Sequence, residues 1–384
     1  MSTRIDIHIL QSVPTSCLNR DEYGSPKTGF YGGVQRGRNS SQSEKRQLRE
    51  YLKQKDPLHF GVFQTRFLAE KLAPELETKG LHKELCVPYA QAVAAFYGGW
   101  DNKAKREKTV TSFSLGEVIL MSQRIKEAYD KDKCEKLFVL EKVKTNKPKS
   151  GKKPIKNENT EVSSEKKAED KMVLVCKEAL LKKDDKMADI GQIASFGRMM
   201  TSDPEIEMQG AISHAHSITV HENENDEDYL SAVDDVKPDS GSGHINSIEC
   251  NSGCYYRFFS VDVDLFNKNM SQVSEDERRK MLEFIIEGCV VASLPNGRRN
   301  TMYAKTLPFA VLGLRRENSF DLSLADAFES PLVSDNGYKV ESRNRLEKSW
   351  NEKKISLGDR LGVKKEIWYP DSHLDKFIED LLNG

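Results

Sequence analysis

The second half of the chain contains a strand, a helix and a second strand in succession, and this order limits the possible folds. Residues 253–266, GCYYRFFSVDVDLF, alternate with the period of a strand. Ser274 and Glu277 have the spacing of a capping box and begin a predicted helix over 275–293. Residues 302–316, MYAKTLPFAVLGLRR, are predicted to form the second strand. This β-α-β order favours an α+β protein with a ferredoxin-like sheet.

The first half adds a strand and a helix and then changes to helical patterns. In RIDIHILQSV, three isoleucines alternate with Asp6 and His8, which predicts a half-buried strand. A glycine-rich loop over 17–38 and a helix over 39–55 follow, and residues 56–140 are mainly helical in pattern. The sheet is therefore expected to be split by a helical insertion. RNA readers of the RRM type share this plan and use the open sheet face or appended loops, although a fold does not establish a function.

The helix over 39–55 carries much of the positive charge of the N-terminal region. Ser41 and Glu44 have capping-box spacing. Three apolar residues form a narrow stripe: Leu48, Tyr51 and Leu52. Four cations fall on the adjoining face: Lys45, Arg46, Arg49 and Lys53. Because helix N-termini attract anions, this helix is either a phosphate site or an ordinary solvated helix.

Charge is unevenly distributed, although the whole chain has a net charge of only −1. Residues 1–55 hold ten Lys and Arg against five Asp and Glu, and residues 142–156 hold seven lysines and no acid. Residues 221–239 hold eight carboxylates. One surface can therefore attract an anionic polymer while another repels it. Residues 142–170 are too polar to bury a core and are expected to be a disordered insertion.

The cysteines and the hydropathy pattern indicate a cellular location. The seven cysteines are scattered and odd in number, which favours a reducing compartment over a disulfide framework. The N-terminus lacks the apolar core of a signal peptide, and the sequence has no run long enough to span a membrane. We expect a cytoplasmic protein that needs no cofactor.

Three histidines, His214, His216 and His221, raise the possibility of a metal or nuclease site. Alternation would place His214 and His216 on one strand face, but the sequence puts no suitably spaced carboxylate beside them, and a metal site needs three or four ligands. CNSGC, residues 250–254, has no second cysteine pair, so zinc is not expected. The evidence for catalysis is weak, and a metal-dependent RNA nuclease or RNA-processing enzyme using His214 and His216 is kept as the alternative.

Two further segments have more than one interpretation. In FGRMMTS, Gly197 and Arg198 precede two methionines, which either fill a core or lie against a nucleic-acid base beside a backbone-binding arginine. KPDSGSG, residues 237–243, predicts a turn between two strand-like runs. That hairpin is either a surface element without a special role or an arm that reaches a neighbouring copy or wedges a nucleic-acid strand.

Several blocks of the sequence, in the same order, resemble the CasC family. They span most of the chain: SCLNRDE (16–22), SSQSEKRQLR (40–49), FGRMMTS (196–202), GAISHAHSITVH (210–221), YLSAVDD (229–235), SGCYYRF (252–258) and NGRRNTMYA (296–304). Members of this family form the backbone of the type I-E CRISPR surveillance complex, Cascade.

The resemblance implies a non-catalytic subunit that binds the guide RNA (crRNA). It implies an RRM-like (ferredoxin-like) palm, inserted helical fingers and a β-hairpin thumb. Copies would oligomerise along the guide, each thumb displacing one nucleotide, and base pairing would then read the target DNA in antiviral defence. Expected partners are crRNA, target DNA, further copies of the chain and other Cascade subunits. The expected boundaries are palm 1–55, fingers 56–194, palm 195–220, thumb 221–250 and palm 251–384.

The resemblance also assigns RNA-binding residues, with some departures from the family pattern. The residues it assigns are Arg20, Ser40, Gln42, Ser43, Lys45, Arg46, Arg49, Met199, Tyr229, Leu230 and Ser231. Arg198 is added to the predicted RNA-binding residues because it lies beside Met199. Arg49 stands where lysine is common, which keeps the charge and adds a planar fork. Tyr229-Leu230 replaces a frequent aromatic pair. The lysines of 142–156 either extend a contact with target DNA or form a solvated linker.

Overall fold

A computed structural model describes residues 2–132, 180–182, 184–185, 187–200, 203–237, 241–292, 294–295, 297–318 and 320–383. The predicted disordered insertion, 142–170, lies outside these residues. The chain forms two compact units. Unit 1 comprises Met1–Phe60, Ala194–Gly197 and Gly210–Gly384, and unit 2 comprises Gly61–Ile193 and Arg198–Gln209. Unit 2 thus includes a short segment from within the predicted palm stretch 195–220.

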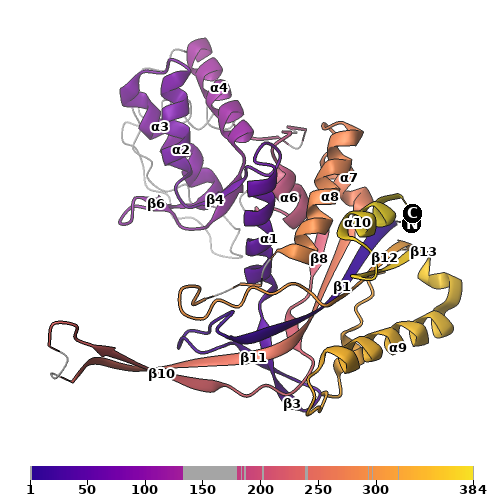
Figure 1. Ribbon diagram of the computed structural model, residues 1–384. Coiled ribbons are helices and arrows are strands. Elements are labelled where there is room, and N and C mark those ends of the chain that lie inside the picture. The colour runs from indigo at the N-terminus through magenta and orange to yellow at the C-terminus, as the bar shows by residue number, and fades with distance from the viewer. Residues whose placement is uncertain are drawn as a thin grey trace, which may run out of the picture. The chain divides into compact units, whose positions relative to one another are not determined.

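Unit 1 is built on one large antiparallel sheet (Figure 1), which confirms the α+β class. Within the described residues the sheet has nine strands in the order β13-β12-β1-β11-β9-β3-β2, with β8 and β10 also paired to β11. Their bounds are β1 Ser2–Ser16, β2 Thr28–Tyr31, β3 Val34–Asn39, β8 Ile212–His214, β9 Ser217–Thr219, β10 Asp226–Val233, β11 Ser242–Asp262, β12 Ala310–Asn318 and β13 Val363–Tyr369.

Two interleaved β-α-β units determine this strand order. Strands β11 and β12 both pair antiparallel with β1, so they run parallel to each other with β1 between them. In the same way β9 and β1 both pair antiparallel with β11. Helix α8 connects β11 to β12, and α1 lies between β1 and β9 in the sequence. The predicted succession of strand, helix and strand is therefore confirmed.

Helices cover both faces of the sheet. The bounds are α1 Ser41–Lys55, α6 Gly191–Phe196, α7 Val263–Asn269, α8 Glu275–Val291, η3 Ala325–Phe328, α9 Lys339–Leu357, η4 Gly358–Leu361 and α10 Leu374–Asn383. Figure 1 shows α1, α8 and α10 on one face and α9 on the other. Helices α1 and α8 meet closely at Gly288, where an added Cβ would lie 2.5 Å from Leu48 Cδ1.

This double cover corrects the predicted half-burial of the first strand. Asp6 and His8 are as fully buried as the isoleucines between which they alternate. Arg316 Nε donates to Asp6 Oδ2 at 2.7 Å, and His8 Nδ1 lies 2.9 Å from the Tyr256 hydroxyl. Polar side chains on β1 are buried because distant strands supply their partners.

The same cover changes the expected mode of RNA reading. The aromatic side chains of Tyr256 and Phe258, in the middle of the sheet, pack in a buried cluster with Phe328, Leu346 and Trp350. The last two belong to α9. Because α9 covers this sheet face, the face is not open, and of the two expected positions for an RNA contact only the appended loops stay as an expectation.

The predicted hairpin is present in unit 1. Strands β10 and β11 pair antiparallel, with Tyr229 opposite Ser247 and Leu230 opposite Asn246. Strand β11 then continues into the main sheet, so the hairpin extends from one end of that sheet (Figure 1). The strand begins earlier than predicted and ends at Asp262, whose carboxylate accepts the Leu265 N–H and caps α7.

Unit 2 is mainly helical. Its elements are β4 Phe63–Thr65, α2 Leu68–Thr78, α3 Lys83–Gly98, β5 Trp100–Asp101, β6 Arg106–Glu107, β7 Thr111–Phe113, α4 Leu115–Asp132 and η1 Pro204–Ile206. Leucines of α2, aromatic residues of α3 and apolar residues of α4 form one buried cluster. No helix in the described part of the chain has the length and apolar character needed to cross a bilayer.

Candidate nucleic-acid interface

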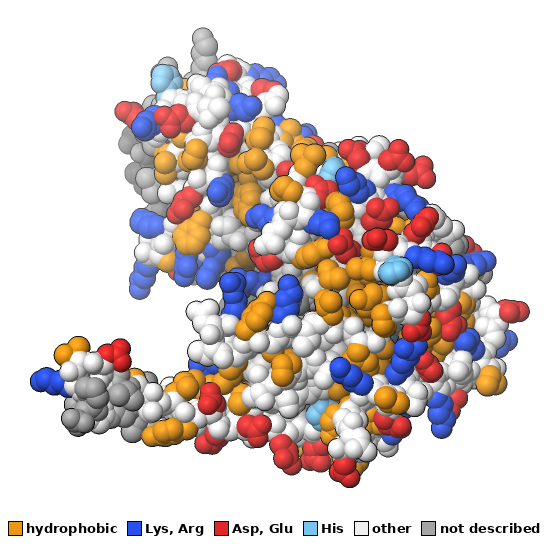
Figure 2. Space-filling model, viewed as in Figure 1, with side chains coloured by type: hydrophobic (Ala, Val, Ile, Leu, Met, Phe, Trp, Pro, Cys, Tyr) orange, Lys and Arg blue, Asp and Glu red, His pale blue; other side chains and the backbone are white. Residues whose placement is uncertain are grey.

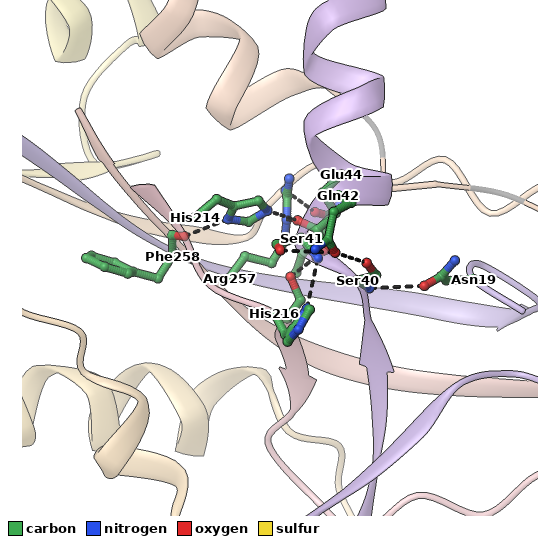
Figure 3. Close-up of polar contacts among 11 residues, drawn as sticks. Asn19, Ser40, Ser41, Gln42, Glu44, His214, His216, Arg257 and Phe258 are labelled. Carbon is green, nitrogen blue, oxygen red and sulfur yellow. Dashed lines mark hydrogen bonds and ion pairs between the residues drawn. The ribbon is translucent and has the colours of Figure 1, made fainter. Parts of the chain in front are cut away.

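The first turn of α1 has an unusual N-terminal cap (Figure 3). Ser40 is the N-cap residue, but its own side chain does not cap the turn. Instead the Ser40 hydroxyl bonds the side chain of Gln42, and the Ser40 N–H donates to Asn19 Oδ1 at 3.0 Å. The Ser41 N–H donates to His216 Nδ1 at 2.9 Å. The predicted capping box of Ser41 and Glu44 is wrong.

Glu44 is absent from the cap because its carboxylate is buried beneath the helix (Figure 3). It accepts hydrogen bonds from His214 Nε2 at 2.9 Å, from Arg257 Nε at 3.1 Å and from the Ser217 hydroxyl. Burial alone would raise the pKa of Glu44, but the charge of Arg257 and the bonds from His214 and Ser217 outweigh it and lower that pKa. Glu44 is therefore an anion that joins the start of α1 to strands β8, β9 and β11.

The same network bears on the predicted metal or nuclease site at His214 and His216. His214 ends strand β8, and both of its ring nitrogens are engaged, Nδ1 with the Phe258 carbonyl at 2.7 Å and Nε2 with Glu44. His216 lies beyond the strand and is exposed. The expected sharing of one strand face is therefore wrong. Within the described residues no group of three or more His, Cys, Asp or Glu is placed to hold a metal ion.

Cations surround the N-terminal part of α1, residues 40–49, which we call the mouth of α1. Lys45 and Arg49 are half-buried, and Arg46 is exposed. Burial lowers the pKa of Lys45, and the charge of Arg49 lowers it further. Burial also lowers the pKa of Arg49. Cations that repel one another beside a positive helix end favour binding of an anion.

A surface hollow of about 560 Å³ brings three predicted RNA-binding residues together. Arg20, Ser43 and Arg46 line it, although Arg20 is 23 residues away from Ser43 in the sequence. Asp21 and Glu22 also line the hollow. The hollow therefore has a basic wall and an acidic wall, and a phosphate would bind at the basic wall.

Arg36, which also adds to the basic character of the N-terminal sequence, has a structural role instead. Its side chain is fully buried and donates to the carbonyl oxygens of Tyr31, Thr219, Phe328 and Glu329. Sequence counting could not separate this arginine from the exposed ones, because its acceptors come from distant segments.

In unit 2 the predicted pair Arg198 and Met199 has two opposite environments. Met199 is 80% exposed, whereas Arg198 is only 7% exposed. The Arg198 guanidinium bonds Glu117 Oε1 at 2.6 Å and the Ile206 carbonyl at 3.0 Å. The Arg198 side chain is thus engaged inside unit 2, whereas the Met199 side chain is presented to solvent.

The hairpin presents the remaining predicted residues. Tyr229 is 65% exposed, Leu230 is half-buried and Ser231 is exposed. Asp and Glu side chains gather where the hairpin leaves the sheet (Figure 2). The exposed carboxylates there belong to Glu222, Glu224, Asp226 and Glu227. The carboxylates at the foot of the hairpin repel a phosphate chain. The less charged middle section, around Tyr229 to Ser231, is the part of the hairpin that favours approach of a nucleic acid.

Sequence reasoning missed a basic turn between β5 and β6. Lys103, Lys105, Arg106 and Lys108 lie within six residues, and Figure 2 shows Lys and Arg side chains gathered there. Asp101 Oδ1 accepts the N–H groups of Lys103 and Ala104 and so fixes the turn. The signal was visible as NKAKREK, but the denser lysines of 142–156 obscured it.

The fold and this interface define a mixed α/β protein with a large antiparallel sheet and a basic helix mouth. The chain belongs to the CT1975-like protein family, Cas_CT1975, whose model matches residues 5–376. No curated protein matches the chain.

Two solved structures resemble the chain over nearly its whole length. One is a chain of a "CRISPR RNA-guided surveillance complex, pre-nicking", with 25% identity, a TM-score of 0.73 and 99% of each chain covered. The other, from a "CRISPR RNA-guided surveillance complex", has 21% identity, a TM-score of 0.63 and the same coverage, and it supports the fold alone. The resemblance to CasC is confirmed, and these matches support a role in a Cascade-type complex.

Proposed function

We propose that this chain is a non-catalytic, crRNA-binding backbone subunit of a type I-E Cascade complex in the cytoplasm. The observation that carries the proposal is the mouth of α1. Lys45, Arg46 and Arg49 lie together on this helix, and the buried carboxylate of Glu44 fixes the helix start to the sheet. The structural similarity to a chain of a CRISPR RNA-guided surveillance complex, which covers 99% of both chains, supports this assignment.

The guide backbone binds at this mouth. Phosphates contact the cations and the polar first turn through Arg20, Ser40, Gln42, Ser43, Lys45, Arg46 and Arg49. These contacts are independent of sequence, since phosphates position a nucleic acid and bases specify it. A subunit that grips only the backbone can hold any guide, and base pairing then selects the target DNA.

In this proposal unit 1 is the RRM-like palm, unit 2 the fingers and the hairpin the thumb. Tyr229, Leu230 and Ser231 lie across the guide and displace one nucleotide for each copy of the subunit. Met199 packs against a guide base. Further copies and other Cascade subunits complete the complex, and the basic β5–β6 turn offers phosphates of the target DNA a contact.

Native mass spectrometry tests the proposal. The protein is co-expressed with its neighbouring subunits and a CRISPR array with spacers of two lengths. A backbone subunit gives more copies in each complex on the longer guide. One copy on either guide would refute the backbone role and leave a simple RNA-binding module.

A further inference from the structure

The exposed methionine of unit 2 directly follows an arginine that forms a buried ion pair. Met199 is 80% exposed, while the next residue, Met200, is 2% exposed and belongs to the core of the unit. A single exposed apolar residue is common, but Met199 lies between two buried residues, so its outward placement has its cause in the contacts of those neighbours.

The preceding residue supplies that cause. The backbone N–H of Arg198 donates to the Met208 carbonyl at 2.8 Å, and the Met208 N–H donates back at 3.0 Å. The Arg198 side chain adds a bond from Nε to the Ile206 carbonyl at 3.0 Å, and its guanidinium carbon lies 6.0 Å from the centre of the Phe113 ring. Main chain and side chain together fix the residue before Met199.

Glu117 connects this anchor to helix α4. Its Oε1 accepts a hydrogen bond from Arg198 Nη1 at 2.6 Å, and its Oε2 accepts the Ser114 N–H at 2.9 Å. The Ser114 hydroxyl in turn accepts the Glu117 N–H at 3.1 Å. One buried carboxylate therefore closes a capping box at the start of α4 and holds Arg198.

We propose that Arg198 and Glu117 are positioning residues that present Met199 to a base of the guide, with no phosphate contact of their own. The proposal rests on the function proposed above for Met199. Removing either partner frees the segment around Met199, because the other is left buried without its charge partner.

The experiment compares four variants of the full chain assembled on a guide RNA: M199A, R198M, E117Q and D185N. Dimethyl sulfate reactivity of the guide bases reports base contacts, and the salt dependence of guide binding reports phosphate contacts. D185N is the matched control, because Asp185 forms a two-bond ion pair with Arg124 of α4 in the same unit, at 2.5 and 2.6 Å.

We expect M199A to change reactivity at one nucleotide in each repeat. R198M and E117Q should reproduce most of that change with an unchanged salt slope, and D185N should leave the pattern as it is. If R198M does not fold, E117Q alone carries the test, since glutamine keeps the shape of the carboxylate.

The opposite outcomes are distinguishable. A salt slope lowered by about 0.7 in R198M alone would make Arg198 a phosphate contact and overturn the inference. The same reactivity change in D185N would attribute it to general loosening of unit 2. A silent M199A would reject the proposed base contact itself, whereas an active M199A with silent R198M and E117Q would reject only the positioning role.

Discussion

The mouth of α1 gives the sharpest prediction, because one half-buried lysine can be compared with an exposed lysine on the same helix. Lys45 lies in the first two turns, and Lys53 lies in the last turn. Eight residues separate them, about 12 Å along the helix axis. Replacing Lys45 by alanine removes a charge from the proposed phosphate site, whereas replacing Lys53 removes the same charge at a distance from it.

The expected size follows from counterion release. Each phosphate contact with a single strand contributes about 0.7 to the slope of log K against log salt, so a fourfold rise in salt weakens binding by about 2.6-fold per contact. K45A should lose that part of the slope. At low salt, K45A should also bind the guide about fivefold more weakly than the wild type. This loss corresponds to about 1 kcal/mol, the order of magnitude of a partly screened charge pair.

A pH series tests the same group. The pKa of Lys45 lies below its usual value, because of burial and then Arg49, so the lysine loses its charge at a lower pH than an exposed lysine. A phosphate binds only the protonated form, so wild-type affinity should fall as pH rises toward that range, and the fall should be weaker in K45A.

Fluorescence anisotropy with labelled guide RNA, over a range of salt concentrations, measures these quantities. Circular dichroism shows first that K45A and K53A are folded. The reasoning fails if K45A keeps the wild-type salt slope, or if K53A lowers the slope by the same amount.

Three further predictions concern the hairpin and the core. Replacing Leu230 by glycine should alter the periodic reactivity of the guide bases more than the affinity, and a loss of reactivity along the whole guide would contradict a local wedge. Burial and then the charge of Arg316 lower the pKa of His8 to about 3. The free energy of unfolding should therefore decrease as pH falls below about 6.5, by about 2 kcal/mol at pH 5. H8F should remove this pH dependence, as measured by urea unfolding. Gly288→Ala should destabilise the chain by about 1–3 kcal/mol, because the added Cβ would lie 2.5 Å from Leu48; an unchanged urea midpoint would show that α1 and α8 can separate freely.

The sequence predicted where the strands and helices of unit 1 lie, but it did not predict which of their polar side chains are buried. Alternation placed strands β1 and β11, and the spacing of Ser274 and Glu277 predicted the capping box that α8 has. Alternation failed at Asp6, because a period of two shows which residues share a face but not whether the opposite face is covered. The partner of Asp6 is Arg316, 310 residues later, and no local pattern contains it.

The same limit explains the mixed result at the interface. Resemblance assigned eleven residues by position, and Arg198 was added because it lies beside Met199. Neither argument could show that Arg198 is buried while Met199 is exposed. That difference depends on Glu117, which is 81 residues away in the sequence. Position along the chain gives the candidate, and only tertiary contacts show whether its side chain is available to a ligand.

Glu44 shows how one residue can fit a local pattern and act otherwise. At the third position after a serine it has the spacing of a capping box, yet its carboxylate bonds His214, Arg257 and Ser217 on three strands. Those bonds replace the water that a buried carboxylate loses, and they fix the helix start to a rigid sheet. Two amides at the helix start are bonded by side chains from outside the helix, the Ser40 N–H by Asn19 Oδ1 and the Ser41 N–H by His216 Nδ1. The hydroxyls of Ser40 and Ser41 bond the Gln42 side chain instead of an amide of the turn, and cations surround this fixed helix start, so it favours binding of an anion.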